Sequence, residues 1–102
     1  MTYVFDIDGT ICTQDGDYEE AKPILDRIKK INKLYSEGHT IHFLTARGMG
    51  RSQNENPSLF ENLTQKQLQK WGVKYHELFM GKPCGDLYID DKGIKDEEFF
   101  GN

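Results

Sequence analysis

Two aspartates lie two positions apart, directly after a short apolar segment near the start of the chain. Residues 2–7 are mostly β-branched and aromatic, which is typical of a buried strand, and the run Asp8-Gly9-Thr10 ends it in a tight turn. Residues two apart on an extended segment point to the same side. The carboxyl groups of Asp6 and Asp8 can therefore address one ligand at a strand's carboxyl end.

Other polar residues follow the later predicted strands. In parallel α/β sheets the carboxyl ends of the strands meet at one edge, where ligands bind. Four carboxylates gathered there would repel one another by roughly 4 kcal/mol per close pair at an effective dielectric constant near 20, unless a cation lies among them. Mg²⁺ prefers oxygen ligands and leaves positions for water and phosphate. We therefore expect a magnesium site, and the polar strand ends are Asp6, Asp8, Thr45, Lys82, Asp90 and Asp91.

Short apolar segments alternate with amphipathic ones along the chain. Helices are predicted over residues 21–37 and 57–71, with a terminal helical turn over 94–100, and residues 46–56 read as a loop. Strands are predicted over residues 2–7, 40–45, 73–79 and 87–89. This order predicts one α/β domain spanning residues 1–102. It is a Rossmann-like three-layer sandwich, in which helices cover both faces of a mainly parallel sheet of about four strands.

The order of these motifs resembles that of the haloacid dehalogenase (HAD) superfamily of phosphohydrolases. The similarity comprises Asp6-x-Asp8-Gly9-Thr10, Thr45 at a strand end, Gly81-Lys82-Pro83 and Asp90-Asp91. It covers nearly the whole chain, with each motif at a predicted strand end or in the loop after it. The resemblance implies a HAD-like fold and a phosphoric monoester hydrolase.

The resemblance also implies a role for each motif residue. Asp6 would attack phosphorus and form an aspartyl-phosphate, which water then hydrolyses. Asp8 would act as general acid and base. Lys82 would offset the negative charge of the carboxylate and phosphate, while Thr45 and the backbone at Ala46 would donate hydrogen bonds to the phosphoryl oxygens.

The metal ligands follow from the same resemblance. Asp90 would bind Mg²⁺ directly, together with the Asp6 side chain and the Asp8 backbone carbonyl. Asp91 would act through a metal-bound water or from the surrounding shell.

The gaps between the motifs leave no room for the cap domain that encloses the substrate in many members of the superfamily. The expected site is therefore open to bulky substrates unless a neighbouring subunit covers it, so a homo-oligomer is possible. The runs Thr45-Ala46-Arg47-Gly48-Met49 and Gly81-Lys82-Pro83 are similar to small capless phosphatases of capsule polysaccharide biosynthesis. That similarity implies a sugar phosphate as substrate.

Other residues of the loops have both a functional and a structural interpretation. Arg47 is expected to clamp a phosphate or a sugar carboxylate, and the alternative is a solvated loop arginine. For Arg51, which lies further along the same loop, both roles are equally plausible. Asp15, Asp17 and Tyr18 fall where the superfamily often places a small flap, and a solvent loop explains them equally well. His39, His42 and His76 match no zinc-ligand spacing, and a structural role is expected for them.

Composition excludes several classes of function. The formal charge is −4 with a pI near 5.3, and the basic residues are scattered, so we expect no nucleic-acid partner. The sequence contains no long apolar run of the kind found in a membrane segment or a signal peptide. We therefore expect a cytoplasmic location, in which Cys12 and Cys84 stay reduced.

Three rival functions share parts of the pattern. A receiver domain of a two-component system also uses aspartates, threonine, lysine and Mg²⁺, but its acidic pair comes first in the chain rather than last. A phospho-ligand sensor or scaffold could retain the fold without catalysis, and turnover of an aryl phosphate would eliminate it. A phosphotransferase would use a sugar as acceptor in place of water, and such enzymes usually carry a cap.

Overall fold

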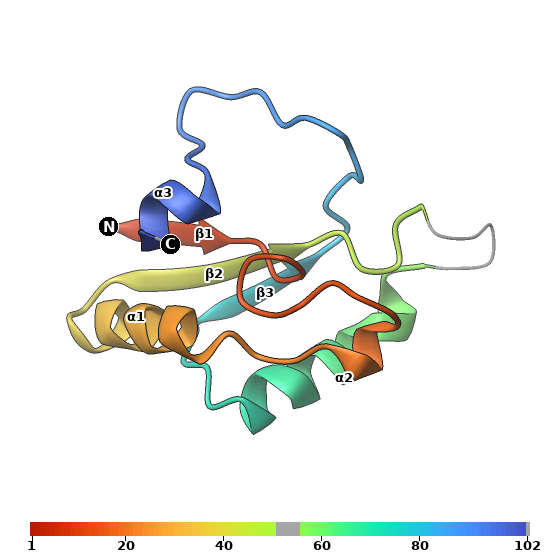
Figure 1. Ribbon diagram of the computed structural model, residues 1–102, viewed down its shortest axis with the longest axis horizontal. Coiled ribbons are helices and arrows are strands. Elements are labelled where there is room, and N and C mark those ends of the chain that lie inside the picture. Colours follow the sequence, from red (N-terminus) through yellow and green to blue (C-terminus); the bar gives the residue numbers. More distant parts are fainter. Residues whose placement is uncertain (51–55, 102) are drawn as a thin grey trace.

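Three parallel strands form the sheet, in the order β1-β2-β3, and two helices cover one of its faces (Figure 1). This computed structural model describes residues 1–50 and 56–101. The α/β class and the parallel sheet are confirmed. The elements are β1 (Thr2–Phe5), η1 (Tyr18–Glu20), α1 (Leu25–Ser36), β2 (Thr40–Thr45), α2 (Ser58–Lys70), β3 (Glu77–Met80) and α3 (Asp96–Phe100).

The strand register places the core residues on one face of the sheet. Phe5 of β1 pairs with Phe43 of β2, which pairs in turn with Leu78 of β3. Ile28 and Ile31 of α1 and Leu68 of α2 belong to the same buried cluster. Burial of each such side chain stabilises the folded state by roughly 1.5–3 kcal/mol. The helices therefore anchor the sheet whose carboxyl edge carries Asp6 and Thr45.

The opposite face of the sheet is not covered within residues 1–50 and 56–101. Val4 is 61% exposed and Phe79 is 48% exposed, and both point away from the core. Two consecutive parallel crossovers of one hand place α1 and α2 on the same side (Figure 1). A helix on the other side needs a reversal of strand order, which this sheet lacks. The prediction of a three-layer sandwich is therefore wrong for the described residues, which form two layers.

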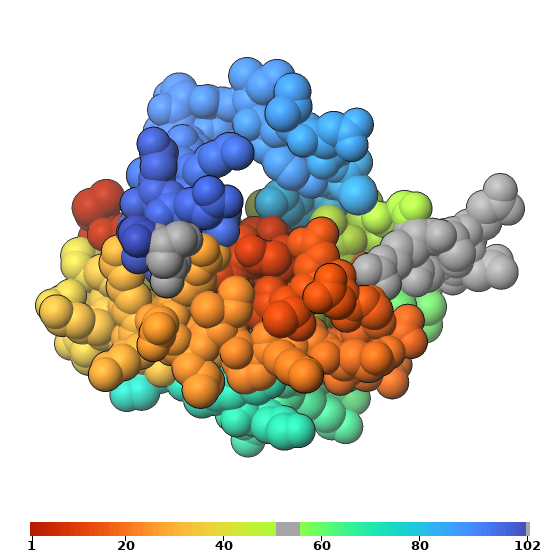
Figure 2. Space-filling model, viewed as in Figure 1, coloured from red at the N-terminus to blue at the C-terminus, as the bar shows by residue number. Residues whose placement is uncertain are grey.

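The predicted fourth strand over residues 87–89 is also wrong. Leu87, Tyr88 and Ile89 are 79%, 54% and 91% exposed and belong to no strand. Residues 83–95 form an exposed arch that stands off the body between β3 and α3 (Figure 2). Tyr88 folds back on this arch, where its hydroxyl donates to the Pro83 carbonyl at 2.7 Å. A three-residue apolar run becomes a strand only when a neighbouring strand pairs with it, and none does here.

The remaining elements lie where the sequence predicts them, but all of them except β2 are shorter than predicted. Residues 40–45 form β2 with the expected bounds, whereas α1 begins at Leu25 because Ile24 is extended and Pro23 bridges to Cys12. Helix α2 follows Pro57, as predicted, and β3 starts only at Glu77. Within residues 1–50 and 56–101, no helix has the length and apolar character needed to cross a membrane.

Arg27 joins three parts of the fold. It is buried in α1, and its Nη1 donates to the Thr10 carbonyl at 2.9 Å and to Asp96 Oδ2 at 2.6 Å. Its guanidinium also lies 4.8 Å from the centre of the Phe100 ring. The turn after β1, helix α1 and helix α3 are thereby held together. The hydrogen bond from Arg27 lowers the pKa of Asp96.

We predict that Asp96→Asn lowers the free energy of unfolding by about 1 kcal/mol at pH 7, with Glu97→Gln on the same helix as control. Because the folded-state pKa of Asp96 is lowered, the ion pair adds to the free energy of unfolding at every pH above the usual pKa range of a carboxyl group. It is lost as the pH falls through the lowered pKa. Urea unfolding between pH 7 and pH 2.5 should show the deficit shrinking. A deficit that is constant over this range would contradict the role of the ion pair.

Candidate functional site

A tight turn after β1 presents the two aspartates. Ile7 is fully buried, and its carbonyl accepts hydrogen bonds from the backbone N–H groups of Thr10 at 3.0 Å and Ile11 at 2.9 Å. Gly9 has a φ of 82°, in the left-handed region, and a Cβ there would lie 2.3 Å from Gln14 Oε1. Glycine is favoured at this position because other residues would be strained there. Phe5 and Ile7, which are buried, therefore alternate with Asp6 and Asp8, whose carboxylates lie at the edge of the core.

Asp6 is the more accessible of the two carboxylates. Its side chain is 35% exposed, and its Oδ1 lies 3.8 Å from Lys82 Nζ. Thr10 Oγ1 donates to Asp6 Oδ2 at 3.4 Å. Burial raises the pKa of Asp6, with a smaller upward contribution from Asp8, while Lys82 and the Ile7 N–H act in the opposite direction. One side of this carboxyl group thus faces an ammonium and the other a hydroxyl.

Lys82 reaches Asp6 because the chain after β3 continues the sheet pairing. The backbone N–H of Lys82 donates to the Thr45 carbonyl at 3.0 Å, just beyond the last pair of β2 and β3. The ammonium also lies 4.3 Å from the centre of the Tyr88 ring. The structure therefore brings together Asp6, Asp8, Thr45 and Lys82, as the parallel-sheet argument predicts.

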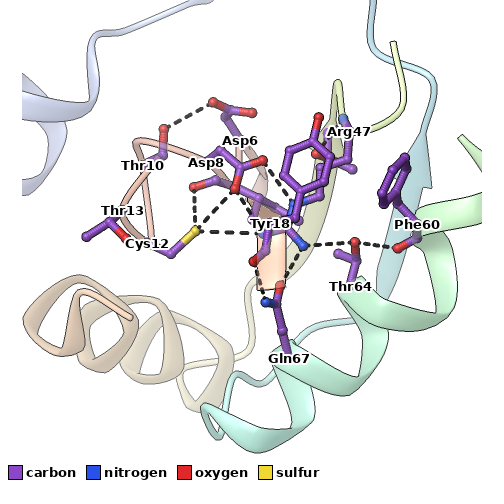
Figure 3. A network of polar contacts seen from close by, with 12 residues as sticks. Asp6, Asp8, Thr10, Cys12, Thr13, Tyr18, Arg47, Phe60, Thr64 and Gln67 are labelled. Carbon is purple, nitrogen blue, oxygen red and sulfur yellow. Dashed lines mark hydrogen bonds and ion pairs between the residues drawn. The ribbon is translucent and has the colours of Figure 1, made fainter. Parts of the chain in front are cut away.

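Asp8 is held by a buried arginine (Figure 3). Arg47 Nε donates to Asp8 Oδ2 and Arg47 Nη2 donates to Asp8 Oδ1, both at 2.9 Å. The Arg47 side chain is fully buried, whereas that of Asp8 is 21% exposed. This is the two-point geometry in which guanidinium and carboxylate bind most strongly.

The other donors of Arg47 are also occupied. Its Nη1 donates to Thr64 Oγ1 at 3.1 Å and to Gln67 Oε1 at 2.5 Å, and its Nη2 lies 4.0 Å from Cys12 Sγ. All five N–H groups of the guanidinium therefore have a partner. This position does not support the expected clamp on a ligand, nor the solvated alternative, because the side chain turns into the protein and not toward solvent.

The Tyr18 ring covers the face of the Arg47 guanidinium. Its ring lies 4.9 Å from the Arg47 guanidinium and 4.9 Å, edge to face, from the Phe60 ring. Its hydroxyl accepts from the Gly48 N–H at 3.4 Å, and its carbonyl accepts from Gln67 Nε2 at 2.7 Å. The segment around η1 is therefore packed against the site. Asp15 and Asp17, by contrast, are exposed to solvent.

Thr45 and Ala46 occupy the end of β2. Thr45 is 1% exposed, and its hydroxyl oxygen accepts a hydrogen bond from the Arg47 N–H at 3.1 Å. Ala46 is half-buried, and its carbonyl accepts from the Met49 N–H at 2.9 Å. Arg51 lies outside the described residues.

Asp90 and Asp91 lie on the exposed arch. Asp90 Oδ1 accepts from the backbone N–H groups of Lys92 at 2.6 Å and Gly93 at 2.5 Å, which forms a local turn. Among the described residues, no group of three or more histidine, cysteine, aspartate or glutamate side chains is placed to hold a metal. The carboxylate oxygens suit Mg²⁺ chemically, and the exposed side of Asp6 could supply one of them. The structure does not bring the second acidic pair to the first.

Thr64, Gln67 and Cys12 are site residues that sequence reasoning missed. Thr64 and Gln67 lie on the side of α2 that carries Phe60 and Leu68, and both are buried. A threonine and a glutamine on an otherwise apolar helix stripe are the signal that could have revealed a buried polar partner. Cys12 is buried as a free thiol beside Asp8, and burial raises its pKa to about 12, which makes it a poor nucleophile.

The histidines have neighbours that fit a structural role. His76 Nδ1 accepts from the Ile41 N–H at 3.0 Å, and His39 Nδ1 lies 3.0 Å from the amino terminus. The His42 ring lies at a tilt beside the Phe79 ring on the other face of the sheet, with ring centres 5.3 Å apart. None of the three lies among the site contacts given above.

Comparison with solved structures finds chains that are similar to this one over nearly its full length. A protein from Vibrio cholerae with a crystal structure is 31% identical, with a TM-score of 0.85, over 99% of this chain and 88% of that chain. A chain in the structure of a Pnkp1/Rnl/Hen1 complex is 20% identical, with a TM-score of 0.62, over 96% of this chain and 33% of that chain, and this likeness shows the fold alone. No protein-family model and no curated protein matches the sequence.

The raised pKa of Asp6 generates a prediction about stability. Because the folded-state pKa is raised, ionised Asp6 destabilises the fold, and this penalty appears as the pH rises through the folded-state pKa. Asp6→Asn should therefore raise the melting temperature by a few degrees at pH 7.5 and by less near pH 4. Asp15→Asn, on an exposed loop, serves as control. A lower melting temperature for Asp6→Asn at pH 7.5 would contradict the burial penalty.

Proposed function

This chain belongs to the same family as the Vibrio cholerae protein, and we propose that it is a Mg²⁺-dependent phosphomonoester hydrolase that forms an aspartyl-phosphate on Asp6. The observation that carries the proposal is the environment of Asp6. Its carboxyl group is partly exposed at the carboxyl edge of a parallel sheet, 3.8 Å from an ammonium and two residues from a second carboxylate. These are the groups that phosphoryl transfer to a carboxylate requires.

In the first step an Asp6 oxygen attacks phosphorus, and the bond from phosphorus to the leaving oxygen breaks. Lys82 Nζ lies beside Asp6 Oδ1 and offsets the negative charge that the phosphate adds next to the carboxylate. The partial exposure of Asp6 allows a substrate phosphate to reach it. Asp8 enters this step as the carboxylic acid and gives its proton to the leaving oxygen, and the proton that it takes from water in the second step restores the acid.

In the second step a water molecule attacks the aspartyl-phosphate. Asp8 takes a proton from that water, the bond between phosphorus and the Asp6 oxygen breaks, and phosphate leaves with both aspartates restored. The sum is one ester and one water converted into one alcohol and one phosphate. Arg47 occupies one lone pair of each Asp8 oxygen, and the Cys12 thiol donates to Asp8 Oδ1 at 3.5 Å, so the second lone pair of Oδ2 is left for proton transfer.

The residues that would hold Mg²⁺ are Asp6, the Asp8 carbonyl, Asp90 and, through water, Asp91. When bound, the ion would neutralise charge on the transferring phosphate. Binding by both acidic pairs requires the arch of residues 83–95 to approach the end of β1. The arch is exposed and carries apolar side chains that gain by leaving water.

The openness of the site is compatible with a bulky substrate. Residues 1–50 and 56–101 contain no domain above the strand ends, so a bulky alcohol can accompany the phosphate. We propose a sugar phosphate of cytoplasmic polysaccharide biosynthesis, as the motif similarity to capsule phosphatases suggests. A second subunit could cover the open side.

Phosphate release from a panel of sugar phosphates, nucleotides and an aryl phosphate tests the proposal. Wild type should release phosphate with Mg²⁺ and stop on chelation, and Asp6→Asn should lower turnover at least ~1000-fold because the nucleophile is lost. Asp15→Asn is the matched control and should keep full activity. Turnover that survives in Asp6→Asn would sink the mechanism, and a wild type inactive on every substrate would favour the non-catalytic sensor.

The role of Asp90 is tested by its dependence on Mg²⁺. Asp90→Asn should raise the Mg²⁺ concentration for half-maximal turnover about tenfold or more, because one charged oxygen ligand is lost. Asp86→Asn lies on the same exposed arch and should leave this concentration unchanged. Equal Mg²⁺ dependence in wild type and Asp90→Asn would show that the arch does not close onto the metal.

A further inference from the structure

We propose that Arg47 is a positioning residue that sets the orientation of Asp8, and that Gln67 locks Arg47 to the segment around Tyr18. This inference rests on the proposed function of Asp8 in proton transfer. It assigns the buried arginine to the enzyme's own acid–base group and not to the substrate.

The first step of the argument is the geometry of the ion pair. Two hydrogen bonds of 2.9 Å join Arg47 to the two oxygens of Asp8, so the carboxylate plane is aligned with the guanidinium plane. Rotation of Asp8 about either side-chain bond would break at least one of them. Because the Arg47 side chain is fully buried, water cannot replace the lost bond.

The second step is the support of Arg47 itself. Thr64 Oγ1 and Gln67 Oε1 accept hydrogen bonds from the two N–H groups of Arg47 Nη1. Thr64 Oγ1 in turn donates to the Phe60 carbonyl at 2.7 Å (Figure 3). Both partners come from α2, a regular helix that packs on the sheet. The guanidinium is therefore oriented by a rigid element, and a position fixed in this way is what proton transfer in a fixed geometry needs.

The third step is the double contact of Gln67. Its Oε1 accepts from Arg47 Nη1 at 2.5 Å, while its Nε2 donates to the Tyr18 carbonyl at 2.7 Å. One amide thus connects the arginine with the segment that follows the first motif. Tyr18 covers the guanidinium, and its segment lines a recess of about 10 Å³ beside Asp8, which is room for about one water molecule.

The leaving group provides a readout that a merely structural role would not change. An alkyl leaving oxygen needs a proton in the transition state, whereas a nitrophenolate leaves readily without one. A misplaced Asp8 should therefore impair hydrolysis of a sugar phosphate far more than hydrolysis of p-nitrophenyl phosphate. General loss of folded protein would lower both rates by the same factor.

Three variants separate the contacts. Arg47→Lys keeps the charge but loses the two-point geometry. It should lower kcat on glucose 6-phosphate about 100-fold and kcat on p-nitrophenyl phosphate less than tenfold. Gln67→Met removes both contacts at similar volume. It should lower the ratio of kcat on glucose 6-phosphate to kcat on p-nitrophenyl phosphate about tenfold. Gln67→Glu keeps an acceptor for Arg47 but loses the donor to Tyr18, so it should give an intermediate ratio.

The outcomes distinguish this inference from the proposed function. A wild type that is inactive on both probes would overturn the proposed function and this inference with it. An active wild type whose Arg47→Lys and Gln67→Met variants lose both activities by equal factors would overturn the positioning role alone. NMR adds a readout independent of turnover: the Arg47 Nε proton should exchange slowly with solvent in wild type and at least tenfold faster in Gln67→Met. Fast exchange in wild type would also contradict the inference.

Discussion

The buried ion pair between Arg47 and Asp8 is the interaction on which the site depends. A buried guanidinium is stable only if its donors are occupied, and breaking such a pair from one side costs roughly 3–5 kcal/mol. Its partners come from the turn after β1 and from α2, while Tyr18 covers its face. The ion pair therefore determines how the first motif lies against the second helix, and with it the direction of Asp8.

The two aspartates of the first motif acquire different environments although they are two residues apart. Asp6 faces outward, with the Lys82 ammonium and the Thr10 hydroxyl beside its carboxyl group. Asp8 faces inward to Arg47 and Cys12. Different surroundings let two chemically identical groups serve different steps of one reaction, which in the proposed function would be attack on phosphorus and proton transfer. The strand β1 ends at Phe5, and the turn at Gly9 follows directly after Asp8, so the second carboxylate lies where the chain already changes direction.

Local patterns in the sequence predicted much of the framework. Alternating apolar residues determined β2 with its bounds, and helical spacing between Pro57 and Gly72 predicted α2. Parallel strands then required that Asp6, Thr45 and Lys82 meet at one edge, which the Lys82–Thr45 backbone hydrogen bond shows. These features depend on short-range periodicity and on the alignment of parallel strands, both of which are readable from a single chain.

The sequence by itself thus determined that β1, β2, β3, α1 and α2 form, and it determined both ends of β2. Only the tertiary structure decided that Arg47 turns inward, because the direction of a loop side chain depends on acceptors such as Gln67 that are distant in sequence. The tertiary structure likewise decided that residues 87–89 stay outside the sheet and that one sheet face stays uncovered by the described part of the chain. Strand pairing is an interaction between segments, and an apolar run carries no information about whether a partner edge is available to it.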